Sequence, residues 1–164
     1  MSNPMSFAKS AAIFLLLVFV ISTSQARAQN QTPANLPFVG WTDPDTGLTW
    51  TKADNGSDVD WKQATTYCSN LRLGGYSDWR LPTIDELQSI YDPSINIPAG
   101  QDSDGEPIIW HVKGNLKLSN GGQWSSSLIN AASGDAWIFH FGGGRRFPVL
   151  LGISGRACAL CVRH

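Results

Sequence analysis

The chain has 164 residues, a formal net charge of −1 and a hydrophobic fraction of 42%. General nucleic-acid binding requires a strong basic excess, so this charge argues against nucleic acid as a partner. The length suits one domain with one core. Seven Trp and 16 Gly indicate a loop-rich α+β module rather than a helix bundle.

The N-terminus has the three parts of a secretory signal peptide. Lys9 precedes an apolar run over residues 11–21, and Ala26-Arg27-Ala28 forms a cleavage site. The run is shorter than the roughly 20 residues of a membrane-spanning helix, so an uncleaved anchor is the weaker alternative. The predicted order is a signal peptide (1–28), a flexible lead-in (29–42) and a domain (43–164) without a transmembrane segment, located in the periplasm, outside the cell or on its surface.

Two patterns open the folded part. Residues 46–51 alternate apolar side chains with threonine after an Asp-Pro-Asp-Thr-Gly turn, which predicts a strand. Asp60 can cap a helix whose apolar positions recur at helical spacing and include Cys68. Gly74-Gly75 is expected to end this helix.

The string Trp79-Arg80-Leu81-Pro82-Thr83 precedes a second predicted helix. Thr83 and Glu86 form a capping box, in which each side chain satisfies a free backbone N–H group. Pro82 biases the residue before it towards an extended conformation. The chain therefore arrives extended and turns directly into a helix, which Asp92-Pro93 is expected to stop.

The second half reads as a long irregular segment followed by β structure. Residues 94–120 show only turns and short apolar pairs, and such segments are commonly functional in compact domains. Strands are predicted at 123–127 and 136–141, with a tight turn at Gly142–Gly144 and a terminal strand at 157–163. One strand, then two helices, then several strands is an order typical of an α+β fold.

Four motifs occur in sequence along the chain: Gly47-Leu48-Thr49-Trp50, Trp79-Arg80-Leu81-Pro82-Thr83, Trp124-Ser125-Ser126-Ser127 and Cys161-Val162-Arg163. Together with a helix that carries Cys68, they resemble the Lcl C-terminal domain family over roughly residues 43–163. This bacterial module is named for the terminal domain of a collagen-like adhesin. The Arg-Leu-Pro-Thr string is also similar to one in formylglycine-generating enzymes. The resemblance implies a C-type-lectin-like α+β fold, with two helices flanking small antiparallel β-sheets, long loops and termini close together.

In such a fold the Trp79 string is architectural. The Trp79 ring would pack into the core beneath the second helix. Arg80 would donate its planar fork to backbone carbonyls or to a carboxylate such as Asp78 or Glu86. The Pro-Thr pair that follows would then set the start of the helix.

Three cysteines are an odd number for an exported chain. The resemblance implies a bridge between Cys68 and Cys161, which leaves Cys158 over. On a strand, Cys158 and Cys161 would face opposite sides and should not pair. A redox C-x-x-C motif is the alternative, but its chemistry needs a helix N-terminus. We therefore interpret Cys158 as a buried, inert thiol.

Asp102, Asp104 and Glu106 bring three carboxylates into the irregular segment. Ca²⁺ prefers such oxygen ligands, whereas an acidic turn that binds nothing has the same composition. Calcium is the one cofactor that the sequence suggests. Glu106-Pro107 is followed by Ile108 rather than by the Asn of sugar-binding C-type lectins, so calcium-mediated sugar binding of that kind is not expected.

Arg145 and Arg146 follow the glycine turn, and Lys113 and Lys117 lie elsewhere in the late half. Arginine forks suit sulfate, phosphate or carboxylate groups, and the resemblance to the adhesin domain implies sulfated glycosaminoglycans. These four residues are the candidate ligand contacts, with a solvated hairpin tip as the alternative. Cleavage would leave ten basic residues against 13 acidic ones, which disfavours a polyanion.

The sequence contains no catalytic constellation. His111, His140 and His164 are scattered, without a Ser/His/Asp order or metal-ligand spacing. The leading hypothesis is an exported, non-enzymatic binding or adhesion module that recognises a glycan or a protein at the cell envelope. The alternatives are an oxidoreductase-like relative of the formylglycine-generating enzymes and a structural envelope subunit. The oligomeric state is not indicated.

Overall fold

The computed structural model describes residues 40–130 and 134–164. The predicted signal peptide and residues 29–39 of the predicted lead-in lie outside these described residues. In the described part of the chain, no helix is long and apolar enough to cross a membrane. The elements follow in the order β1 (Gly40–Thr42), β2 (Thr49–Thr51), α1 (Trp61–Asn70), α2 (Ile84–Ser89), β3 (Ile97–Gln101), β4 (Pro107–Trp110), the 3₁₀ turn η2 (Lys113–Asn115), β5 (Gly122–Asn130), β6 (Asp135–His140), β7 (Arg145–Leu150) and β8 (Val162–Arg163).

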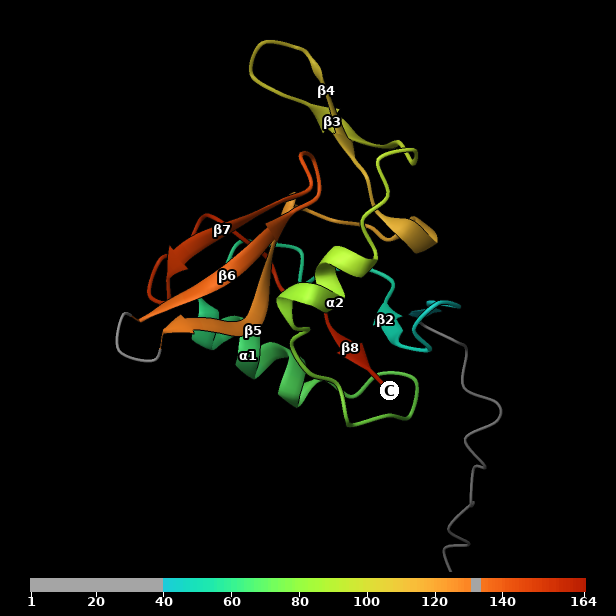
Figure 1. Cartoon of the computed structure of the whole chain (residues 1–164), viewed down its shortest axis with the longest axis vertical. Coiled ribbons are helices and arrows are strands. Elements are labelled where there is room, and N and C mark those ends of the chain that lie inside the picture. Colours follow the sequence, from blue (N-terminus) through green and yellow to red (C-terminus); the bar gives the residue numbers. More distant parts are fainter. Residues whose placement is uncertain (1–39, 131–133) are drawn as a thin grey trace, which may run out of the picture. The chain divides into compact units, whose positions relative to one another are not determined.

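Within the described residues, the strands form three small antiparallel sheets (Figure 1). Their strand orders are β1-β2-β8, β3-β4 and β5-β6-β7. Because β1 and β8 both pair with β2, the first and last strands lie in one sheet. Two helices with small antiparallel sheets make the fold α+β, as predicted.

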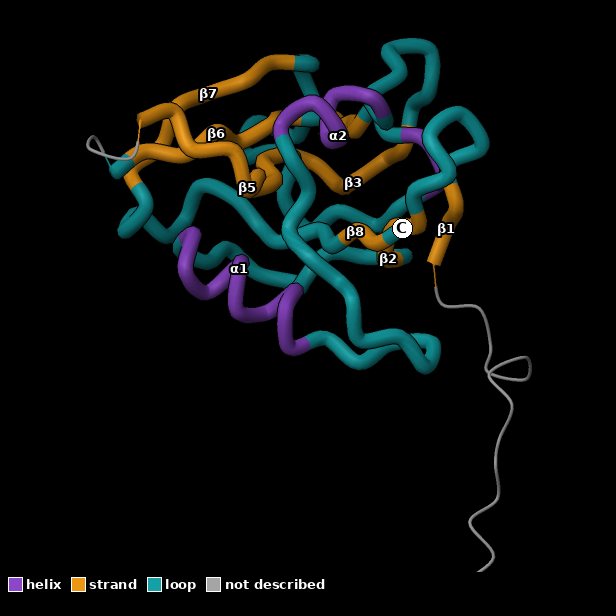
Figure 2. The backbone as a smooth tube through the Cα atoms, turned by 60° about the horizontal axis from the view of Figure 1, so that its bottom comes forward, coloured by secondary structure: helices purple, strands orange, loops and turns teal. Residues whose placement is uncertain are grey.

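Two clusters of buried side chains form the core. Leu87 of α2 belongs to the first cluster, and Cys68 of α1 belongs to the second. Strand β6 supplies both clusters, because successive side chains of a strand point to opposite faces. Phe139 enters the first cluster and Ile138 the second. Figure 2 shows the two helices apart, with β5 and β8 between them.

Both predicted helix starts are confirmed. Asp60 accepts a hydrogen bond from the backbone of Gln63 at 2.7 Å, and the Gln63 side chain accepts one from the backbone of Asp60 at 3.0 Å. Thr83 and Glu86 make the same reciprocal pair at 3.2 and 2.7 Å. Both helices are shorter than predicted, since α1 ends at Asn70 and α2 at Ser89.

The prediction of irregular structure over residues 94–120 is wrong in its first part. Residues 97–110 contain the β3–β4 hairpin, whose register shifts between Pro98 and Gly100. Pro98, Gly100 and Pro107 interrupt the alternation of apolar and polar residues that predicts a strand. Neither strand of the hairpin could therefore be recognised from the sequence.

Other boundaries also differ from the prediction. The first sheet begins with β1 at Gly40, inside the predicted lead-in, and the strand predicted at 46–51 is limited to β2. Strand β7 was not predicted, because its centre holds Pro148, which edge strands tolerate. Of the terminal strand predicted at 157–163, only β8 is regular, and residues 157–161 run buried beside the start of β5.

Candidate functional site

The Trp79 string is an architectural element, as predicted. The Trp79 side chain is buried, and its indole N–H donates to the Leu73 carbonyl at 3.2 Å. The expectation that this ring packs beneath the second helix is wrong, because Trp79 belongs to the second core cluster with Cys68 of α1, whereas Leu87 of α2 belongs to the first. The backbone of Arg80 pairs with Val162 in both directions, each at 2.9 Å. The Arg80 guanidinium donates to both carboxylate oxygens of Glu86 at 2.7 and 2.8 Å. These bonds hold the pKa of Glu86 below its ordinary value, although burial opposes them.

Of the partners expected for Arg80, the structure selects Glu86. Asp78 instead accepts from Arg163 at 2.8 Å, and the Arg163 guanidinium lies 3.6 Å from the centre of the Tyr76 ring. The Trp79 string and the C-terminal strand are therefore joined to each other by hydrogen bonds and an ion pair.

The disulfide joins Cys68 and Cys161, the pair that the resemblance implied. Their Cα atoms lie 5.5 Å apart, and the bridge connects α1 to the C-terminal segment. Cys158 is a buried free thiol, as predicted. Its sulfur lies 3.6 Å from Oδ1 of Asp58. Burial, with a smaller contribution from Asp54 and Asp58, raises the pKa of Cys158, so this thiol is a poor nucleophile.

A buried carboxylate that the sequence did not single out organises the entry into β5. Asp54 is 7% exposed. It accepts hydrogen bonds from the backbone and hydroxyl of Ser119 at 2.7 and 2.9 Å, and from the Gln123 amide at 3.0 Å. Next to it, Asn120 donates to Asp58 at 2.8 Å. This network fixes the position of residues 119–123, so its role is structural.

The three candidate calcium ligands lie on the loop of the β3–β4 hairpin. Oδ1 of Asp102 accepts the backbone N–H groups of Asp104 and Glu106, both at 2.9 Å. Within residues 40–130 and 134–164, no group of three or more His, Cys, Asp or Glu side chains is placed to hold a metal ion. This geometry supports the alternative of an acidic turn.

The four candidate anion contacts are divided between β7, which holds Arg145 and Arg146, and the segment around η2, which holds Lys113 and Lys117, and two of them are already paired. Arg146 donates to Asp85 at 2.6 Å and to Gln88 at 2.7 Å, which ties β7 to α2. Lys113 donates to Asp45 at 2.9 Å. The remaining two candidates, Arg145 and Lys117, are exposed. Within the described ranges, their side chains make no hydrogen bond or ion pair.

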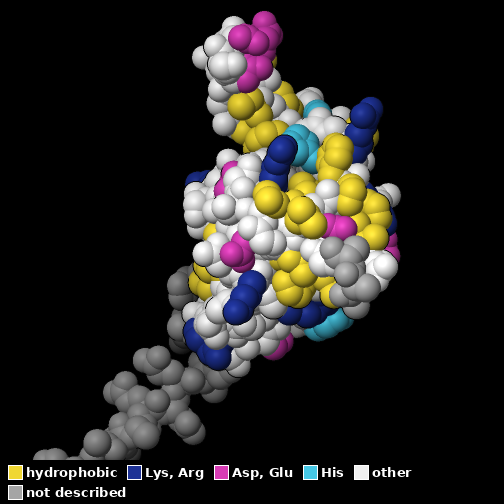
Figure 3. Space-filling view, turned by 90° about the vertical axis from the view of Figure 1, so that its left-hand side faces the viewer, with side chains coloured by type: hydrophobic (Ala, Val, Ile, Leu, Met, Phe, Trp, Pro, Cys, Tyr) yellow, Lys and Arg dark blue, Asp and Glu magenta, His cyan; other side chains and the backbone are white. Residues whose placement is uncertain are grey.

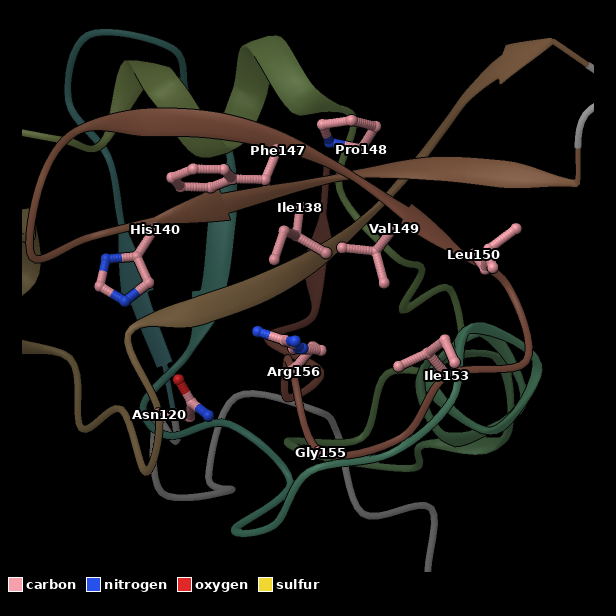
Figure 4. Close-up of a pocket in the computed structure, with 10 residues that line it drawn as sticks. All are labelled: Asn120, Ile138, His140, Phe147, Pro148, Val149, Leu150, Ile153, Gly155 and Arg156. Atoms are coloured by element: carbon pink, nitrogen blue, oxygen red, sulfur yellow. The ribbon is translucent and has the colours of Figure 1, made fainter.

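An open groove of about 710 Å³ lies along β6 and β7 (Figure 4). Ile138 and His140 of β6 and residues 147–150 of β7 line one side, and the segment 153–156 lines the other with Asn120. Three of its apolar side chains are strongly exposed: Phe147 (43%), Leu150 (55%) and Ile153 (41%). A contiguous exposed apolar patch commonly marks an interaction site.

The polar groups of the groove are few. The Arg156 guanidinium points into it (Figure 4), and this exposed side chain makes no hydrogen bond or ion pair with any described residue. No Asp or Glu is among the lining residues. Burial lowers the pKa of His140, whose ring packs edge-to-face against Trp110 and Phe147. The groove is therefore apolar, with one unpaired cation.

This groove was not predicted from the sequence. Its lining comes from separate segments between residues 120 and 156, and no single segment carries a motif. The apolar residues 147–151, which follow two arginines, could have indicated strand β7 and its exposed surface. The strand was not recognised because Pro148 lies at its centre.

The fold and the bridge define a small disulfide-bonded α+β module. Within this class, the chain belongs to the Lcl C-terminal domain family, whose family model matches residues 40–163. No curated protein matches the chain.

Proposed function

We propose that this protein is an exported, non-enzymatic binding or adhesion module that engages a partner at the cell envelope through the groove along β6 and β7. The observation that carries this proposal is an exposed apolar surface with an unpaired Arg156 and no carboxylate in its lining. A partner that covers the apolar side chains and neutralises the cation lowers the free energy of the complex, so such a surface favours binding.

Export is proposed from the N-terminal sequence, and the disulfide agrees with it. Bridges form and persist in oxidising compartments such as the periplasm and the cell exterior, and Cys68–Cys161 closes a separation of 93 residues. We also propose that the α+β fold is C-type-lectin-like. In support, both ends of the domain lie in one sheet, and a bridge joins the first helix to the C-terminal segment.

The oxidoreductase alternative finds little support in the described residues. Two of the three thiols form a disulfide, and the third is buried with a raised pKa. A catalytic His commonly donates Nδ1–H to a carboxylate that orients its ring. Nδ1 of His140 instead accepts from the Gly142 N–H at 3.2 Å, and no Asp or Glu is among the lining residues of the groove. Binding therefore fits the chemistry of the groove better than acid–base or thiol catalysis does.

A protein partner suits this groove better than a neutral glycan. Five of the lining residues are aliphatic, namely Ile138, Pro148, Val149, Leu150 and Ile153, and the polar side chains of the lining are few, whereas a neutral sugar needs many polar contacts. A sulfated glycan is the second candidate, because Arg145 and Lys117 are exposed cations without partners in the described ranges. The two candidates use different residues and can be separated by substitution.

The test is binding of the exported protein to arrays of glycans, glycosaminoglycans and envelope proteins, with calcium and with a chelator. If the groove is the site, Phe147→Ala and Arg156→Glu abolish binding, while Arg145→Glu with Lys117→Glu leaves it intact. If a sulfated glycan is the ligand, the pattern reverses. Lys62→Glu, on the exposed side of α1, is the charge-matched control. Binding that survives all of these substitutions would overturn the proposal.

A further inference from the structure

The β3–β4 hairpin extends from the domain as an arm, defined here as residues 97–110 (Figure 1). Its two strands pair only with each other. The arm is anchored at its base, where Ile97 and Trp110 pack against the first core cluster, whereas residues 98–107 are exposed. A two-stranded hairpin without a covering surface is marginally stable in water. The arm would therefore gain stability by packing on a partner.

The chemistry of the arm is apolar along its strands and acidic at its loop. The strands contain Pro98, Ala99, Pro107, Ile108 and Ile109, and no Lys or Arg occurs between residues 97 and 110. Figure 3 shows the acidic side chains gathered at the tip, clear of the rest of the domain. The carboxylates of Asp104 and Glu106 have no partner among the described residues.

The groove offers the complementary chemistry. Its exposed side chains are apolar, its lining has no carboxylate, and Arg156 is unpaired in the described part of the chain. The base of the arm also borders one end of the groove, because the Trp110 ring packs against His140 with centroids 5.7 Å apart. Arm and groove are therefore neighbours in one molecule, while the acidic tip lies away from the domain.

We propose that the arm of one copy occupies the groove of a second copy, with Asp104 and Glu106 facing Arg156. Each copy carries both parts, so two copies can exchange arms reciprocally about a two-fold axis. The apolar strands of the arm would cover Phe147, Leu150 and Ile153, and the acidic tip would neutralise the cation. The inference rests on the proposed function only in treating the groove as a binding surface, and it names the second copy as the occupant.

The test is the mass of the exported protein measured by light scattering and sedimentation over a range of concentrations. We expect a monomer–dimer equilibrium that weakens as salt rises, because exposed ion pairs are screened. Asp104→Lys with Glu106→Lys, and separately Arg156→Glu, should weaken dimerisation about tenfold or more. Asp102 is left unchanged, because its carboxylate holds the loop of the arm. Lys62→Glu should dimerise like the unmodified protein.

Mixing the two charge-reversed variants provides the sharpest outcome. In the mixed pair, one arm and groove keep their original charges and the other arm and groove are both reversed, so dimerisation should recover. Two results would overturn the arm exchange: a monomer at every concentration, or charge-reversed variants that each dimerise as tightly as the unmodified protein. If the protein remains a monomer while Phe147→Ala still abolishes binding on the arrays, only this inference fails and the proposed function stands.

Discussion

The guanidinium of Arg80 lies 2.7 and 2.8 Å from the two carboxylate oxygens of Glu86. The same carboxylate accepts the backbone N–H of Thr83 at 2.7 Å, so it closes the capping box of α2 as well. Arg80 in turn bridges to the C-terminal strand through Val162. One ion pair thereby connects the start of α2 to the first sheet.

Replacing Arg80 with alanine should lower the free energy of unfolding. The substitution leaves Glu86 without its bidentate partner, and Glu86 is only 19% exposed. The Arg80 side chain is 37% exposed, which weakens the pair, so we expect a loss of about 1–3 kcal/mol. Urea denaturation measures it. Arg80→Lys should recover only part of the loss, because an ammonium cannot make the two parallel bonds. A Lys62→Ala control should leave the transition in place, and an unshifted transition for Arg80→Ala would contradict the architectural role.

The same pair predicts an acid-dependent loss of stability. The pKa of Glu86 is lowered in the folded protein, first by its bonds to Arg80. A lowered folded pKa contributes stability above the ordinary pKa of about 4.3, and this stability is lost as pH falls through the folded pKa. Glu86→Gln should therefore be clearly less stable than the unmodified protein near neutral pH, and the difference should shrink below about pH 4. Denaturation of both proteins across this pH range tests the prediction. A difference in the free energy of unfolding that does not change with pH would show that the Arg80–Glu86 pair is not its cause.

Reduction of the disulfide should destabilise the protein strongly. The bridge spans 93 residues, and closing a loop of that length restricts the unfolded chain by about 4–5 kcal/mol in the chain-entropy model. The paired replacement of Cys68 and Cys161 by alanine should reproduce the loss without a reductant. Peptide mapping without reduction should join Cys68 to Cys161, and a Cys68–Cys158 bridge would contradict the structure.

Cys158 should react slowly in the folded protein. Its thiol is buried and its pKa is raised, first by burial, so little thiolate is present near neutral pH. Alkylation should be slow under native conditions and rapid in denaturant. Rapid native alkylation would reopen the interpretation of Cys158-Ala-Leu-Cys161 as a redox motif.

Export should remove residues 1–28. The apolar run and the Ala26-Arg27-Ala28 site predict cleavage after Ala28. N-terminal sequencing of the exported protein should therefore begin at Gln29. An exported protein that retains Met1 would show that the segment is not a cleaved signal.

The features recognised in the sequence were those that depend on neighbouring residues. A capping box needs a hydroxyl or carboxylate and a partner three residues later, so Asp60 and Thr83 predicted both helix starts. The α+β class followed from the order of helical and strand patterns, and the string around Arg80 marked the family. Glu86 was one of two carboxylates expected for Arg80, and only the packed structure distinguished it from Asp78.

The sequence by itself therefore determined the helix starts, the α+β class and the family. The tertiary structure decided the groove and the arm. Arg156 becomes an unpaired cation over apolar side chains only when residues 153–156 lie opposite β6 and β7, and no local pattern encodes that approach. Strands β3, β4 and β7 contain proline or glycine, which weakens the alternation on which strand prediction relies. Each of these strands pairs with its neighbour in the chain, but the position of the hairpins on the domain depends on contacts with residues distant in sequence, such as the packing of Ile97 and Trp110 against the first core cluster.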